Sequence, residues 1–71
     1  MNILIFRTDI KKKKSVKKVK RILAKNPKIT DCFIDIKDID NVLRLETKKE
    51  LKESDIIYLV KYMGFQCEVL V

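Results

Sequence analysis

Residues 6–23 read FRTDIKKKKSVKKVKRIL, and this stretch decides the fold. Residues 3–8 are rich in β-branched and aromatic side chains, which predicts a strand. Residues 13–25 carry apolar side chains at the spacing of one helical face: Val16, Val19 and Leu23, with Ile22 beside them. Pro27 ends this helix, because proline pushes the residue before it out of the α region. The stretch therefore predicts a strand that runs through a loop into an amphipathic helix.

The rest of the chain predicts a hairpin, a second helix and a last strand. Two segments alternate apolar and polar side chains on either side of a turn at residues 38–41: residues 31–37 and 42–47. Residues 50–63 have helical spacing and stop before Gly64, the residue type that most often follows a helix C-terminus, and residues 65–71 are again β-prone. The side chains expected to face inward are Cys32, Ile34, Ile36, Leu43, Leu45, Ile56, Leu59, Val60, Met63, Cys67, Val69 and Val71.

This order of elements predicts an α+β fold. We expect the ferredoxin-like βαββαβ split βαβ sandwich, with an antiparallel sheet in spatial order 4-1-3-2 and both helices on one face. A chain of 71 residues can form only one core, so residues 1–71 are expected to be a single domain. No stretch approaches the roughly 20 apolar residues of a membrane span, nor the apolar core of a signal peptide. A cytoplasmic location follows as the default.

Charge is concentrated in the first part of the chain. Residues 1–30 hold eleven Lys or Arg and the single acid Asp9, whereas residues 31–71 hold six basic and nine acidic residues. Most of the positive charge lies in the loop and the first helix, as a basic patch: Lys11, Lys12, Lys13, Lys14, Lys17, Lys18, Lys20, Arg21 and Lys25. Such a patch suits phosphates or an acidic protein surface.

Three places in the chain resemble the heavy-metal-associated domains of copper chaperones and metal-pumping ATPases. Residues 6–10 precede the loop as the family's first strand does, with Ile10 where a core-facing methionine usually sits. The apolar spacing of residues 16–23 matches the helix that follows the family's second cysteine. Residues 63–65, read as Met-Gly-Phe, match its small residue, glycine and aromatic after the second helix. The resemblance covers residues 4–69 and implies the same ferredoxin-like fold.

The metal ligands of that family are not conserved in this chain. Lys12 and Ser15 stand where the resemblance places the two cysteines, and neither is a ligand for a soft ion such as Cu(I). The neighbouring lysines would also repel a cation. Cys32 and Cys67 lack CxxC spacing, there is no histidine, and both cysteines are expected to be small apolar core residues. We therefore expect no metal and no cofactor.

The remaining candidates are binding functions. The sequence has no histidine, no glycine-rich phosphate loop and no pair of carboxylates in an apolar environment that would support catalysis. We therefore expect that the protein is not an enzyme. The expectation is a ligand-less, heavy-metal-associated-like domain that acts as a protein-interaction or regulatory module with an acidic partner. The alternative is nonspecific binding of a polyanion, either nucleic acid or an anionic surface, through the basic loop and first helix. Sequence-specific RNA reading is disfavoured, because the outward positions of the two central strands hold no aromatic side chain.

One more surface is a candidate for binding. The alternation predicts an apolar group on the sheet face away from the helices: Ile3, Ile5, Phe33, Val42 and Leu70. Two uses of this interaction face stay open, docking of a partner and weak homodimerisation, and the dimer could also form along the edge of the fourth strand.

Overall fold

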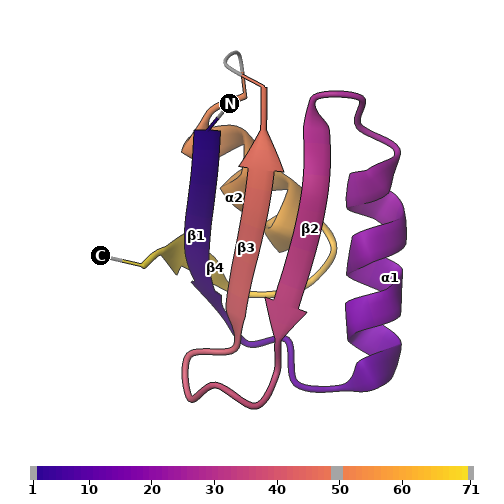
Figure 1. Ribbon diagram of the computed structural model, residues 1–71. Coiled ribbons are helices and arrows are strands. Elements are labelled where there is room, and N and C mark those ends of the chain that lie inside the picture. Colours follow the sequence, from indigo (N-terminus) through magenta and orange to yellow (C-terminus); the bar gives the residue numbers. More distant parts are fainter. Residues whose placement is uncertain (1, 49–50, 71) are drawn as a thin grey trace.

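The computed structural model describes residues 2–48 and 51–70 as one antiparallel sheet with two helices (Figure 1). The elements are β1 Asn2–Thr8, α1 Lys13–Ala24, β2 Ile29–Asp35, β3 Val42–Thr47, α2 Glu53–Tyr62 and β4 Cys67–Val69. The strand order β2-β3-β1-β4 is the predicted order 4-1-3-2 read from the other edge. The fold is therefore the predicted ferredoxin-like βαββαβ sandwich.

The core lies between the sheet and the two helices. Its buried side chains are Phe6, Ile10, Val19, Leu23, Ile34, Leu43, Leu45, Leu51, Ile56, Val60 and Cys67. Burial alternates along β3, where Leu43 and Leu45 are fully buried, because successive side chains of a strand point to opposite faces of the sheet. The predicted inward positions are confirmed as buried or partly buried, except Val71, which lies outside the described residues.

Gly64 ends the second helix as predicted. Its φ of +97° is left-handed, and its N–H donates to the Lys61 carbonyl at 2.9 Å while the Phe65 N–H donates to the Val60 carbonyl at 3.2 Å. This pair of bonds is the Schellman arrangement that closes a helix C-terminus. Within residues 2–48 and 51–70, neither helix is long and apolar enough to cross a membrane.

Several predicted element bounds were wrong. β2 runs over Ile29–Asp35 and not 31–37, because Ile29 pairs with Thr47 across an irregular register and the Asp35 carboxylate turns the chain by accepting the Lys37 N–H at 3.0 Å.

The other differences in bounds are at the ends of four elements. β1 begins at Asn2, one residue before its predicted start, and α2 ends at Tyr62, one residue before its predicted end. α1 ends at Ala24, one residue early, and α2 begins at Glu53, where the Asp55 carboxylate accepts the Lys52 N–H at 3.0 Å; residue 50, the predicted start of α2, lies outside the described residues. β4 is limited to Cys67–Val69, since Phe65 still bonds to the helix end and the Gln66 N–H bonds to Asp9.

Candidate functional site

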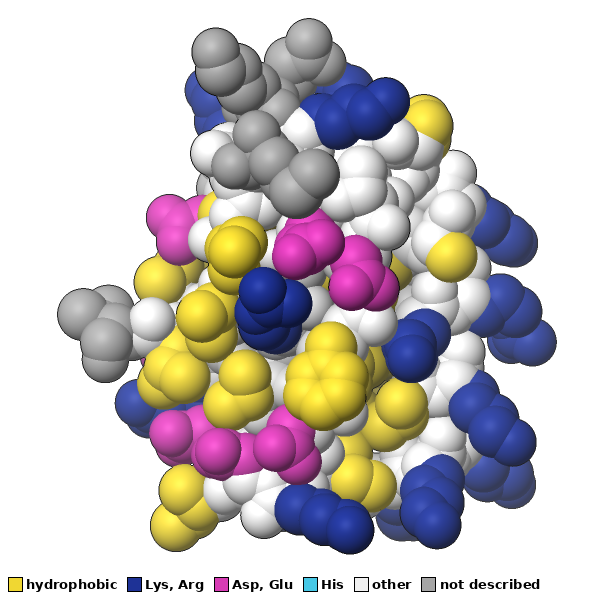
Figure 2. Space-filling model, in the orientation of Figure 1, with side chains coloured by type: hydrophobic (Ala, Val, Ile, Leu, Met, Phe, Trp, Pro, Cys, Tyr) yellow, Lys and Arg dark blue, Asp and Glu magenta, His cyan; other side chains and the backbone are white. Residues whose placement is uncertain are grey.

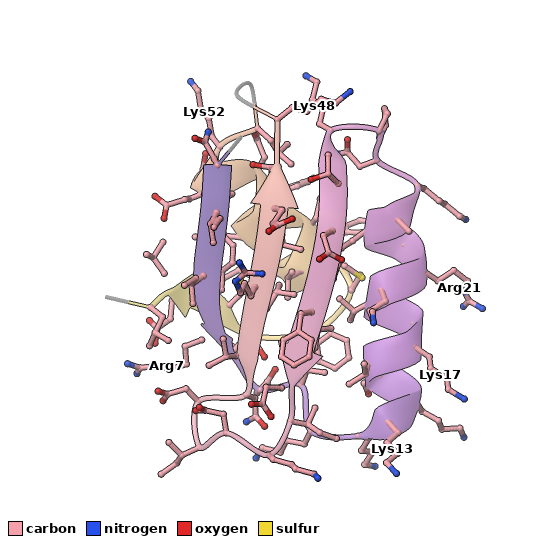
Figure 3. All side chains as sticks on the ribbon, in the orientation of Figure 1. Arg7, Lys13, Lys17, Arg21, Lys48 and Lys52 are labelled. Atoms are coloured by element: carbon pink, nitrogen blue, oxygen red, sulfur yellow. The ribbon has the colours of Figure 1, made fainter. Side chains whose placement is uncertain are left out.

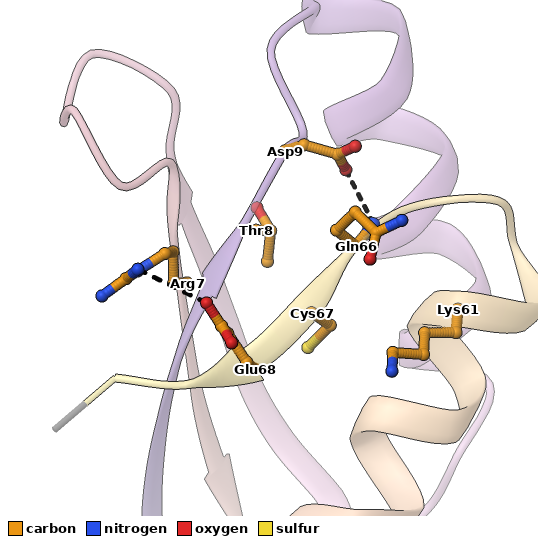
Figure 4. Close-up of a pocket in the computed structure, with 7 residues that line it drawn as sticks. All are labelled: Arg7, Thr8, Asp9, Lys61, Gln66, Cys67 and Glu68. Carbon is orange, nitrogen blue, oxygen red and sulfur yellow. Dashed lines mark hydrogen bonds and ion pairs between the residues drawn. The ribbon is translucent and has the colours of Figure 1, made fainter.

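The loop between β1 and α1 is anchored on three sides. The Thr8 hydroxyl donates to the Asn41 carbonyl at 2.6 Å and accepts the Ile10 N–H at 3.2 Å. The Asp9 carboxylate accepts the Gln66 N–H at 2.8 Å, which ties the loop to the start of β4 (Figure 4). The Ile10 side chain is fully buried, as predicted for the family's methionine position. These contacts hold the loop backbone in place up to Ile10, and the lysines follow directly after this fixed segment.

Sequence reasoning missed these anchors. Thr8 and Asp9 are polar residues at a strand end, which alone indicates only a turn. Their partners lie 33 and 57 residues away along the chain. Only the pairing of β1 with β3 and β4 brings them together.

The start of α1 is unusual in its charge. Lys12 is the N-cap residue, and its carbonyl accepts the Val16 N–H at 3.0 Å, but no side chain caps the helix. The first turn contains no acid, and Ser15 lies half-buried within it. Helix N-termini favour acceptor side chains and negative charge, so lysines here oppose the helix dipole. Local stability alone does not account for this sequence.

The donor groups near the loop do not fit a soft metal ion. Lys12 offers only donors, and Ser15 only a hydroxyl. The two thiols lie on the outer strands, Cys32 on β2 and Cys67 on β4, at opposite edges of the sheet. Burial raises the pKa of each thiol to about 11, although Lys20 near Cys32 and Lys61 near Cys67 lower it in part. A raised thiol pKa opposes formation of the thiolate, which is the form that binds metal.

The same holds for other ligand types in the part of the chain that the structure describes. No three His, Cys, Asp or Glu side chains in it are grouped closely enough to hold one metal ion.

The residues of the predicted basic patch are all exposed. We call these nine residues the basic surface: Lys11, Lys12, Lys13, Lys14, Lys17, Lys18, Lys20, Arg21 and Lys25. Figure 3 shows Lys13, Lys17 and Arg21 pointing away from the sheet along the outer side of α1. None of the nine forms an ion pair with another described residue. The basic surface therefore presents unneutralised positive charge to solvent.

A second feature is an open cavity of about 380 Å³ at the edge of β4 (Figure 4). The residues that line it are Arg7, Thr8, Asp9, Lys61, Gln66, Cys67 and Glu68. Arg7 is already paired with Glu68 at 3.4 Å and with Asp40 at 3.5 Å, and Asp9 holds the Gln66 N–H. The charges of this cavity are largely used within the fold, so it is a weaker candidate than the basic surface.

The residues of the predicted interaction face lie on the open side of the sheet. Ile3, Ile5 and Phe33 are exposed, and Val42 and Leu70 are half-buried. This face of the sheet points away from the two helices. The structure thus keeps the two predicted binding surfaces apart.

Comparison with known proteins gives matches in structure only. No family model and no curated protein matches the sequence. The yeast copper transporter domain Ccc2a superposes with a TM-score of 0.86 at 18% identity, over 99% of this chain and 96% of that one. A chain of the Atx1-Cu(I)-Ccc2a complex gives 0.88 at 18% identity, over 100% and 97%.

A third structure, described by the words "Crosstalk between Cu(I) and Zn(II) homeostasis", gives a TM-score of 0.85 at 14% identity, over 99% of this chain and 100% of that one. At these identities the likeness establishes the fold.

Proposed function

We propose that this chain is a single heavy-metal-associated-like domain that has lost tight metal binding at the family's loop and acts in the cytoplasm as a non-catalytic protein-interaction or regulatory module. It docks through the basic surface onto an acidic face of another protein. The observation that carries the proposal is a set of nine exposed cations that form no ion pair with the residues the structure describes and that extend from the loop along α1.

The position of Lys12 and Ser15 supports the loss of metal binding. The fold is shared with domains described as a copper transporter and as members of a Cu(I) complex between two proteins. In this chain the corresponding loop carries Lys11 to Lys14, so its charge is reversed relative to a pair of thiolates. A partner for this loop therefore offers carboxylates and not a metal-binding site.

The anchored loop favours docking with little ordering cost. Thr8, Asp9 and Ile10 fix the backbone from which the lysines project. A surface that is ordered before binding loses less conformational entropy on association. The partner is attracted by long-range charge, so association is fast and weakens as salt is added.

Affinity capture from the native host with matched charge variants tests the proposal. Lys13→Glu with Lys17→Glu reverses two charges on α1, and Lys48→Glu with Lys52→Glu makes the same net change at the other end of the molecule (Figure 3). All four side chains are exposed, so neither variant disturbs the core. We expect a stoichiometric protein partner with wild type and the control variant, and at least a tenfold loss with the α1 variant.

Two results would contradict the proposal. Capture of nucleic acid in place of protein, with nuclease treatment abolishing the complex, would favour the polyanion alternative. Equal loss of the partner in both variants would assign the effect to net charge and remove any special role of the basic surface.

A further inference from the structure

Cross-strand pairing arranges the open sheet face in three rows. In the order β2, β3, β1, the first row is Asp31, Glu46 and Ile3, the second is Phe33, Arg44 and Ile5, and the third begins with Asp35 and Val42. The Leu70 N–H donates to the Ile5 carbonyl at 3.0 Å, which places Leu70 beside the second row. Apolar side chains from β2, β3, β1 and the end of the chain thus surround Arg44 in the middle of the sheet, and we call this group the apolar band.

The apolar band is open to solvent. Ile3 is 54%, Ile5 38% and Phe33 55% exposed. Figure 2 shows hydrophobic side chains gathered around one basic group on this face, with acidic groups on two sides of them. A contiguous apolar patch with a polar rim is typical of a protein-binding surface.

The rim of the band is negative. Arg44 is paired with Glu46 at 3.5 Å, and Arg7 with both Asp40 and Glu68. These ion pairs neutralise the two arginines of the face.

Two further carboxylates form no ion pair with another described residue. Asp31 accepts the Cys32 N–H at 2.9 Å and Asp35 the Lys37 N–H at 3.0 Å, and Asp31 shares a shallow cavity with Lys20 and Arg21 of α1. Although the chain is strongly basic, this face presents an excess of carboxylates.

This charge pattern determines which kind of molecule can bind the open sheet face. A polyanion is repelled by Asp31 and Asp35. Two copies packed face to face would bring their acidic rims together, and like charges at an interface cost affinity. The α1 helix of a second copy supplies positive charge, but the outer side of α1 has no large apolar side chain to cover the band. The occupant must combine an apolar centre with basic flanks.

We propose that the open sheet face docks an amphipathic segment of a second protein, with an apolar centre flanked by Lys or Arg on both sides. Asp31 and Asp35 lie four residues apart on β2, a separation of about 13 Å. Cations that flank an apolar stripe on one face of a helix lie seven residues apart, a rise of about 10.5 Å, and their long side chains reach the remaining distance. This partner is distinct from the acidic partner of the basic surface, so the domain bridges two proteins of opposite charge.

NMR titration of the full chain with designed peptides tests the inference. One probe is a helical peptide with a leucine stripe and two lysines seven residues apart on the same face, and the other has glutamates in place of the lysines. We expect the lysine peptide to shift the amides of Ile3, Ile5 and Phe33, and Phe33→Ser to weaken its binding on the order of tenfold. Tyr62→Ser removes a more exposed aromatic from α2 and should leave the affinity unchanged.

Reversing the charge of the two rim carboxylates tests the inference without removing any apolar side chain. Asp31→Lys with Asp35→Lys should transfer binding on the sheet face from the lysine peptide to the glutamate peptide. Failure of that transfer, or sheet-face shifts of equal size with both peptides on wild type, would overturn the inference. Sedimentation showing that the free chain dimerises through this face would also overturn it. Shifts on α1 with the glutamate peptide report on the basic surface, so failure of one proposal is distinguishable from failure of the other.

Discussion

Lys12 is the residue where local stability and the proposed role conflict most clearly. It occupies the N-cap of α1, where an acceptor side chain would satisfy an exposed backbone N–H. Residues that break a local rule without compensation are expected at functional positions. The proposed docking role accounts for this lysine, whereas helix capping does not favour it.

The first prediction is that Lys12→Asp stabilises the fold. A capping carboxylate and the favourable helix dipole together contribute about 1 kcal/mol, or a rise of roughly 5 °C in melting temperature for a domain of this size. Thermal unfolding by circular dichroism measures it. Lys25→Asp makes the same charge change at the C-cap of α1 and should lower the melting temperature. A rise in both variants would indicate relief of net charge alone.

Thr47 is a second residue with an unsatisfied polar group. Its side chain is fully buried at the end of β3, and within the described part of the chain its hydroxyl has no hydrogen-bond partner. Thr47→Val keeps the shape and removes the hydroxyl, so we expect stabilisation of about 1 kcal/mol in denaturant unfolding. Thr30→Val is the control, because the Thr30 hydroxyl donates to the Glu46 carbonyl at 3.0 Å. A clear loss of stability in Thr47→Val would show that the hydroxyl is satisfied in solution.

At the scale of elements, α1 has a well-packed apolar face, and the positive side chains on its outer side repel one another. Val19 and Leu23 are buried, whereas Lys13, Lys17 and Arg21 form a row of like charges four residues apart on its outer side. Like charges at this spacing destabilise a helix by about 0.2–0.5 kcal/mol per pair. The helix is therefore stabilised by its apolar face against its own surface charge.

Lys17→Glu should relieve this repulsion. At the four-residue spacing it replaces two like-charge pairs by two opposite-charge pairs, so we expect a gain of about 1 kcal/mol in unfolding free energy at low salt. Lys17→Gln removes the repulsion only and should give about half of the effect. The gain should shrink as salt is added; a gain that does not depend on salt would point to another cause.

The basic surface should bind heparin or duplex DNA weakly and with strong salt dependence. If about four lysines meet phosphates, affinity falls on the order of 100-fold between 50 and 200 mM salt. Replacing Lys13, Lys14, Lys17 and Lys18 by Gln should remove most of the binding in a fluorescence titration. Affinity that hardly changes with salt, or that depends on base sequence, would support a true nucleic-acid domain in place of the proposed module.

The elements themselves were largely predictable, because their apolar spacing is strong. Val16, Val19 and Leu23 gave α1 to within one residue at its end, and Gly64 gave the end of α2. The bounds of β2 and β4 were not predictable, since they depend on a register irregularity with β3 and on the Gln66 to Asp9 bond across the fold. Such contacts leave no local signal in the sequence.

At the scale of the whole molecule, topology separates the charge. Placing α1 against one side of the sheet sets the basic surface and the acidic-rimmed apolar face on different sides (Figure 2). The sequence predicted both groups of residues from composition and alternation. It could not predict the ion pairs of Arg7, because Glu68 lies on the neighbouring strand β4 and Asp40 in the turn after β2, whereas Arg44 and Glu46 lie two residues apart within β3.

Competition titration with Cu(I) and a chromogenic chelator tests most directly whether the loop before α1 is the frame of a metal site without its ligands. Wild type should bind no Cu(I) at submicromolar affinity. Lys12→Cys with Ser15→Cys, made together with Lys11→Gln, Lys13→Gln and Lys14→Gln to reduce repulsion, should bind one equivalent. The matched control carries only the three Gln changes and should bind none. Stoichiometric binding by wild type that is lost when only this loop is changed, or no gain in the cysteine variant, would contradict the account.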